Sequence, residues 1–146
     1  MKLIVLLLFL SFFQKPPRTL FESSVVHPEG FLGIRLGNSF RYAEDVLGEP
    51  DVVRNDSLYW QFSSADYEPF ESITVLGSKG KITGFVANIK ASRIKFSELE
   101  LSPQQNRFGV FYATRSYLTQ LGTVKMMVTG PDDTYIARIV ISCDLR

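Results

Sequence analysis

The chain of 146 residues is 45% hydrophobic and 13% aromatic, enough apolar material for one hydrophobic core. Sixteen Lys and Arg against fifteen Asp and Glu leave a formal charge of +1. Nucleic-acid binding needs a clustered excess of cations, so this balance argues against a nucleic-acid partner, and we expect none.

The N-terminal stretch "MKLIVLLLFLSFFQ" has the pattern of a secretory signal. Lys2 precedes an uninterrupted apolar run over residues 3–10, which is too short to span a bilayer as a helix. We therefore expect residues 1–13 to direct export to the periplasm, the cell envelope or the medium of a bacterium. No clear cleavage motif follows, so the sequence leaves cleavage open. We expect a membrane contact only through this segment, and only if it is not cleaved.

Prolines at positions 16, 17 and 28 predict a linker over residues 14–30, and we expect the remainder, residues 31–146, to form one domain. The domain opens with a helix signal: Phe40, Ala43, Val46 and Leu47 fall at helical spacing after a Gly-Asn-Ser turn. Ser39 or Asn38 is the expected cap. Gly48 should end this helix in the left-handed conformation, and Pro50 forbids its continuation.

Two strand patterns follow the helix. Leu58, Trp60 and Phe62 alternate with polar residues, which predicts a half-buried strand with Trp60 in the core. Residues 73–76 and 82–89 then predict a hairpin around the turn "GSKG". The same turn with the next lysine, "GSKGK", invites comparison with a phosphate-binding loop. The GxxxxGK[ST] spacing is missing and no helix follows, so a hairpin turn is favoured.

The last third indicates a second helix and a second group of strands. Apolar residues between positions 110 and 121 fit helical spacing, Leu121-Gly122 resembles the stop at Leu47-Gly48, and two strands follow. The predicted fold class is α+β, with short helices packed on an antiparallel sheet. A tandem arrangement of halves 31–90 and 91–146, each a helix plus strands, is a further hypothesis.

The sequence offers no pattern typical of catalysis, of metal binding or of a cofactor. Cys143, the single cysteine, shares strand parity with Ile139 and Ile141 and is favoured as a small buried residue over a reactive thiol. His27, the single histidine, makes a zinc site improbable on ligand count. Adjacent acids such as Glu44-Asp45 and Asp132-Asp133 lack a base and a nucleophile beside them, so we expect a protein that is not an enzyme.

The order of these motifs resembles the BamE/SmpA family of outer-membrane assembly proteins and the related domains of the β-lactamase-inhibitor-protein type. The matching residues lie within residues 31–89 and are Gly37-Asn38-Ser39, Leu47-Gly48-Glu49-Pro50-Asp51, Trp60-Gln61-Phe62 and Gly80-Lys81. The lipid-attachment cysteine of the assembly lipoproteins and the disulfides of the inhibitor proteins are missing. The resemblance implies an exported domain that binds another protein.

Three aromatic residues are the candidate protein-binding site: Tyr59 on the outward side of its strand, and Tyr67 and Phe70 in the acidic loop after it. The alternative is that the loop aromatics fold back and close the edge of the core. The predicted function is a non-catalytic protein-binding domain, such as an accessory of envelope assembly or maintenance. An inhibitor or immunity-like protein that blocks a secreted enzyme or toxin is the other hypothesis.

Overall fold

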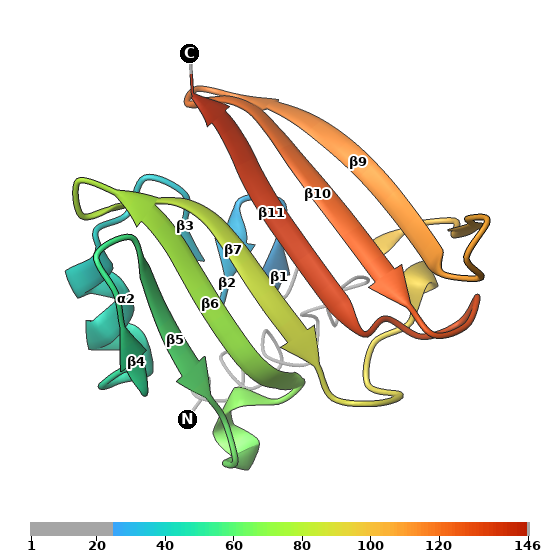
Figure 1. The fold of residues 1–146 in the computed structure, drawn as a ribbon, viewed down its shortest axis with the longest axis horizontal. Helices are drawn as coiled ribbons and strands as arrows, with labels where there is room; N and C mark the ends of the chain where they lie inside the picture. The colour runs from blue at the N-terminus through green and yellow to red at the C-terminus, as the bar shows by residue number, and fades with distance from the viewer. Residues whose placement is uncertain (1–24, 146) are drawn as a thin grey trace, which may run out of the picture.

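The structure is a computed structural model that describes residues 25–145. These residues form a large antiparallel sheet, a small sheet and short helices (Figure 1). The small sheet contains β1 (Val26–His27), β2 (Gly30–Phe31) and β3 (Ile34–Arg35). The large sheet contains β4 (Val52–Val53), β5 (Ser57–Gln61), β6 (Phe70–Ser78), β7 (Lys81–Ile89), β8 (Gln104–Gln105), β9 (Phe111–Thr119), β10 (Gly122–Gly130) and β11 (Arg138–Leu145). The helical elements are α2 (Phe40–Leu47) and the short 3₁₀ helices η1 (Ala65–Tyr67) and η2 (Phe96–Leu99).

The large sheet joins two runs of neighbouring strands through its centre. Its eight strands lie in the order β4-β5-β6-β7-β11-β10-β9-β8. The central pair, β7 and β11, is antiparallel, with Val86 opposite Val140 and Phe85 opposite Ile141. Strands from the first and second halves of the chain therefore hydrogen-bond directly to each other.

The predicted fold class, α+β with helices packed on a sheet, is wrong. Strands dominate the described residues, and α2 is the single α-helix among them. The segment 110–121, predicted to be a helix, is strand β9, which pairs with β10 from Phe111 opposite Gly130 to Thr119 opposite Gly122. Leu121 accordingly lies in a hairpin turn, so the expected repeat of a helix plus strands fails.

The physical reason for this error lies in the residues of β9. Its sequence "FYATRSYLT" is rich in aromatic and threonine side chains, which favour a pleated strand over a helix. Spacing of apolar residues alone did not separate the two states, because several of them fit either period. Pairing with β10 along the whole strand supplies hydrogen-bond partners to the backbone N–H and C=O groups, which in a helix would bond within the segment.

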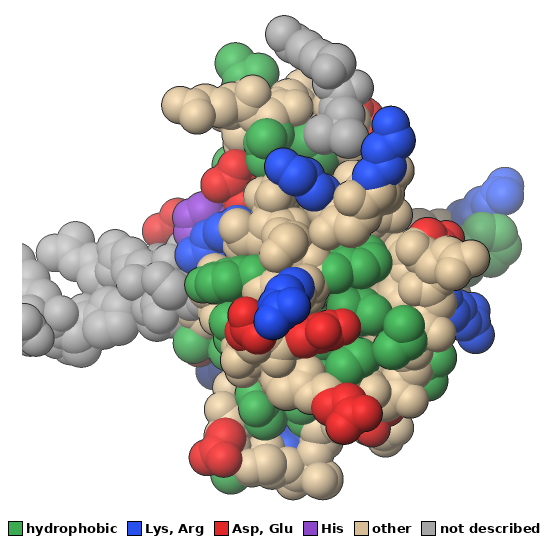
Figure 2. All heavy atoms as spheres, turned by 90° about the vertical axis from the view of Figure 1, so that its left-hand side faces the viewer, with side chains coloured by type: hydrophobic (Ala, Val, Ile, Leu, Met, Phe, Trp, Pro, Cys, Tyr) green, Lys and Arg blue, Asp and Glu red, His purple; other side chains and the backbone are tan. Residues whose placement is uncertain are grey.

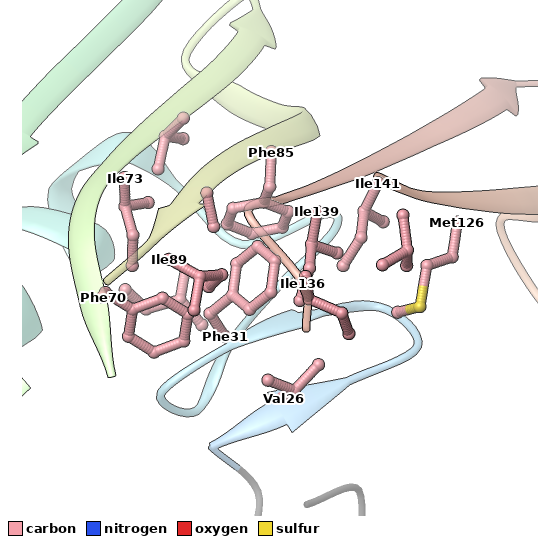
Figure 3. Close-up of a cluster of buried hydrophobic side chains, with 14 of the residues drawn as sticks. Val26, Phe31, Phe70, Ile73, Phe85, Ile89, Met126, Ile136, Ile139 and Ile141 are labelled. Atoms are coloured by element: carbon pink, nitrogen blue, oxygen red, sulfur yellow. The ribbon is translucent and has the colours of Figure 1, made fainter. Parts of the chain in front are cut away.

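The hydrophobic core lies between one face of the large sheet, here called the inner face, and the small sheet (Figure 3). Phe31 of β2 stands at its centre, with ring centroids 5.3 Å from Phe70 and 5.6 Å from Phe85. Ile139 and Ile141 of β11 and Met126 of β10 extend the same cluster and are fully buried. The two halves of the chain thus share one core.

Part of the expected linker belongs to the small sheet. Val26 pairs with Phe31 and has no exposed surface, and His27 pairs with Gly30. An apolar residue opposite Phe31 explains why this stretch is ordered into β1 although Pro28 follows it. Residues 14–24, and with them the predicted signal segment 1–13, lie outside the described residues.

The short helix α2 confirms the predicted cap and stop. The Ser39 hydroxyl accepts a 3.0 Å hydrogen bond from the backbone N–H of Tyr42, and Gly48 follows the last residue, Leu47. Gly48 has φ of 82° as expected, but ψ of −166° places it outside the left-handed helical region that we predicted. The N-terminal end of α2 reaches the sheet at Gly77, where an added Cβ would collide with the Phe40 ring.

The strand and hairpin predictions of the middle segment are confirmed. Leu58, Trp60 and Phe62 are all buried on the inner face, with Trp60 only 2% exposed. Strands β6 and β7 form the predicted hairpin, and Lys79-Gly80 lies in its turn between two strands. The "GSKGK" stretch is therefore a hairpin turn, as favoured from the sequence.

The opposite face of the large sheet, here called the outer face, carries no described element over it (Figure 1). Tyr59, Thr74, Val86, Val140 and Met127 follow one another across five neighbouring strands of this face. All five are at least partly exposed to solvent. This arrangement leaves the edge formed by β4 and β5 accessible from the outer face and from the side.

Candidate functional site

The three aromatic residues singled out in the sequence do not form one surface. Tyr59 is half-buried on the outer face, where it pairs with Val52 of β4 and Thr74 of β6. Tyr67 stacks on Phe62, with ring centroids 4.4 Å apart. Phe70 has 0% exposure and contacts Phe31 in the core. Of the three, only Tyr59 stands on an open face.

The loop aromatics follow the alternative that the sequence left open, because they close the edge of the core. Phe62 is 8% exposed at the end of the inner-face row, and the stacked Tyr67 covers it. The 3₁₀ helix η1, capped by the Ser64 hydroxyl on the N–H of Asp66, places Tyr67 there. Tyr67 and Phe70 are thus packing residues in this structure.

An exposed apolar surface does exist, on the edge of the molecule formed by α2 and β4. Figure 2 looks at this side and shows hydrophobic side chains gathered in the middle of it. The exposed apolar residues of these two elements are Tyr42, Val46, Val52 and Val53. Together with the neighbouring Tyr59 they are called here the β4 surface.

Two local features place these side chains outside. Tyr42 and Val46 are four residues apart on α2 and so share one helix face, while Ala43 and Leu47 take the buried face. Strand β4 is a two-residue edge strand. Val53 pairs with the buried Leu58 and so lies on the inner-face side, Val52 pairs with Tyr59 on the outer-face side, and both are exposed, Val53 by 66%. The sequence signal for this surface is the i, i+4 pair Tyr42 and Val46. It was missed because Val46 was counted among the core-facing residues of the helix.

Most of the exposed charged residues close in sequence to the β4 surface are acidic. The exposed carboxylates near it in sequence are Glu44, Asp45, Glu49, Asp51 and Asp56, against two exposed cations, Arg41 and Arg54. Asp51 also accepts a 2.8 Å hydrogen bond from the backbone N–H of Gln61, which holds it beside β5. Carboxylates thus outnumber cations in this part of the sequence, and Figure 2 shows both acidic and basic side chains beside the hydrophobic ones.

The single cysteine and the single histidine lie near one carboxylate but do not make a nucleophile. Burial raises the pKa of the Cys143 thiol, and the carboxylates of Asp144 and Glu29 raise it further. A raised thiol pKa lowers the thiolate fraction at neutral pH, which disfavours attack by sulfur. Burial, with Arg35 as the next cause, lowers the pKa of His27, while Glu29 acts in the opposite direction.

Over residues 25–145, no group of three or more His, Cys, Asp and Glu side chains is arranged to hold a metal ion. In the same part of the chain, no helix is both long enough and apolar enough to cross a membrane. No protein family, curated protein or solved structure matches the chain.

Proposed function

We propose that this chain is an exported, non-catalytic protein-binding domain that docks its partner on the β4 surface. The observation that carries the proposal is the grouping of Tyr42, Val46, Val52 and Val53 on one edge, although each is a side chain that a core would accept. Exposed apolar residues gathered at one edge among charged side chains are typical of protein interfaces.

The charges near the β4 surface indicate the chemistry of the partner. The exposed charged residues of this part of the sequence are five carboxylates and two guanidinium groups, an excess of negative charge. Electrostatic complementarity then favours a protein that presents an apolar patch bordered by Lys and Arg. Because exposed charges are screened by salt, association with such a partner should slow as ionic strength rises.

Export is the second part of the proposal and rests on the N-terminal sequence. Production of the full chain with a C-terminal tag, followed by cell fractionation, tests it. We expect the tagged protein in the envelope or periplasmic fraction, because the N-terminal signal would direct it there. Recovery of the protein in the cytoplasmic fraction alone would contradict export.

Capture with matched variants tests the docking surface. Wild-type chain, Val53→Lys and Val46→Lys would be crosslinked in envelope extracts and purified, and the retained proteins identified by mass spectrometry. Met127→Lys is the control, because Met127 is 40% exposed, close to the 37% of Val46, but lies on β10 away from the β4 surface. We expect one partner to be retained by wild type and Met127→Lys and lost from both β4-surface variants.

The identity and behaviour of that partner then separate the two hypotheses for its class. A purified envelope component that binds wild type with a salt-sensitive on-rate, and binds Val53→Lys weakly, supports an accessory role. A purified secreted enzyme or toxin whose activity falls as the chain is added supports the inhibitor role. Equal capture by all four proteins would rule out the β4 surface as the docking site.

A further inference from the structure

A cavity of about 490 Å³ opens beside the turn of the β6–β7 hairpin. Three segments that are far apart in sequence form its apolar wall: Leu36 after β3, Ile82 of β7, and Leu121 in the β9–β10 turn. Cys143 of β11 completes the wall. The volume falls within the range of about 300–1,000 Å³ that is usual for sites of small ligands.

The rim of this cavity on the hairpin side is cationic. Lys79 and Lys81 line it together with the hydroxyl-bearing residues Ser78 and Thr83. Both lysines are exposed, and neither forms an ion pair with another described residue. Their ammonium groups are therefore available to an anion that enters from this side.

The Cys143 side of the cavity has the opposite electrostatic character. The carboxylates of Asp144 and Glu29 lie close enough to Cys143 to raise the pKa of its thiol, after the larger effect of burial. The backbone N–H of Leu36 donates to the Glu29 carbonyl oxygen over 2.8 Å, which keeps Glu29 next to the apolar wall. Among the described residues, the two lysines are the only charged ones that line the cavity, and both lie on the hairpin side, so the cavity suits a ligand that carries one anionic end.

We propose that this cavity binds a fatty carboxylate, with its alkyl chain against Leu36, Ile82 and Leu121 and its carboxylate at Lys79 and Lys81. An apolar wall accounts for the chain and the lysine rim for the head group. A small inorganic anion would leave the wall unused, and an uncharged chain would not need the lysines. The cavity shares no residue with the β4 surface, so this inference stands independently of the proposed function.

Isothermal titration calorimetry of the purified chain with dodecanoate, below its micelle concentration, tests the proposal. We expect saturable binding of one dodecanoate per chain. The double variant Lys79→Gln, Lys81→Gln should bind dodecanoate about three- to tenfold more weakly, as expected when two exposed ion pairs are lost. Dodecan-1-ol, which has the same chain without the charge, should bind equally to wild type and to the double variant.

Two further variants separate the head-group and chain contacts. Lys125→Gln removes an exposed lysine from β10 that does not line the cavity, and it should leave dodecanoate binding unchanged. Leu121→Trp should fill the cavity and abolish binding of both ligands, with circular dichroism showing whether the variant is folded. Absence of saturable dodecanoate binding by wild type, or equal binding by the double lysine variant, would overturn the proposal. Both of those measurements remain decisive if Leu121→Trp does not fold.

Discussion

The indole Nε1–H of Trp60 donates a 2.9 Å hydrogen bond to the carbonyl oxygen of Gly48. This bond joins the residue that follows α2 to the fourth residue of the five-residue strand β5. Trp60 is 2% exposed, so its indole N–H would otherwise be buried without a partner. The helix stop and the aromatic strand, two separate signals in the sequence, thus depend on each other in the fold.

Replacing Trp60 should show the packing and the hydrogen bond separately. Trp60→Ala should lower the free energy of unfolding by about 3–5 kcal/mol, the usual range for truncating a large buried aromatic residue. Trp60→Phe keeps much of the packing but leaves the Gly48 carbonyl without its donor, and should cost about 1–3 kcal/mol. Urea denaturation measures both values.

The wild-type protein supplies a direct check of this placement. Trp60 is the single tryptophan of the chain, so the fluorescence maximum reports its surroundings alone. We expect a blue-shifted maximum that moves to the red on unfolding. A maximum typical of a water-exposed indole in the folded protein would contradict the burial of Trp60.

Gly48 and Pro50 should differ in their effect on stability. With φ of 82° and ψ of −166°, Gly48 occupies a region of backbone space that is open almost only to glycine. No atom lies within 4 Å of an added Cβ, so the cost of Gly48→Ala is backbone strain, about 1–3 kcal/mol. Pro50→Ala mainly frees the unfolded chain and should cost about 0.4–1 kcal/mol.

The denaturant midpoints of the two variants give this ranking, provided that their unfolding free energies depend on denaturant concentration with the same slope. A loss from Pro50→Ala that equals or exceeds the loss from Gly48→Ala would mean that the chain does not leave α2 as described. Neither residue belongs to the β4 surface, so the folded fraction of each variant should retain the captured partner.

The single histidine should make stability depend on pH. The His27 Nδ1 atom accepts a 3.1 Å hydrogen bond from the backbone N–H of Glu29, and a proton on Nδ1 would remove this acceptor. Burial and the nearby Arg35 hold the folded pKa of His27 below its ordinary value of 6.5, against the opposing effect of Glu29. The unfolded chain therefore binds more protons, and stability is lost as the pH falls from above 6.5 through the folded pKa.

Comparing the pH dependence of stability in wild type and in His27→Gln shows whether His27 causes it. We expect the urea midpoint of wild type to fall between about pH 7 and pH 5, in the range where an imidazole titrates. The midpoint of His27→Gln should change less over the same interval. Parallel pH profiles for the two proteins would show that His27 is not the group responsible.

Phe70 and Tyr42 provide a test of core against surface. Phe70 is fully buried against Phe31, so Phe70→Ala should lower the free energy of unfolding by about 3–5 kcal/mol. Tyr42 is 44% exposed on α2, and Tyr42→Ala should change stability by less than about 1 kcal/mol while weakening partner binding. Similar stability losses in the two variants would contradict the assignment of Tyr42 to an open surface.

Local signals in the sequence determined the helix 40–47, the buried face of β5 and the β6–β7 hairpin. Ser39 caps its own helix, Gly48 accepts a conformation that other residues resist, and alternation with period two selects one face of a strand. These features depend on residues within a few positions of each other. They could therefore be predicted correctly without the rest of the molecule.

The tertiary structure decided the state of residues 110–121 and the position of the candidate surface. Strand β9 exists because β10 pairs with its whole length, and a pairing partner is not visible in the spacing of one segment. Phe70 is buried and Val53 exposed for the same kind of reason: the small sheet covers the inner face at Phe70, while β4 is too short to be covered. Hydrophobicity makes a side chain suited to a core, but only the neighbours supplied by distant parts of the chain determine whether a core forms around it.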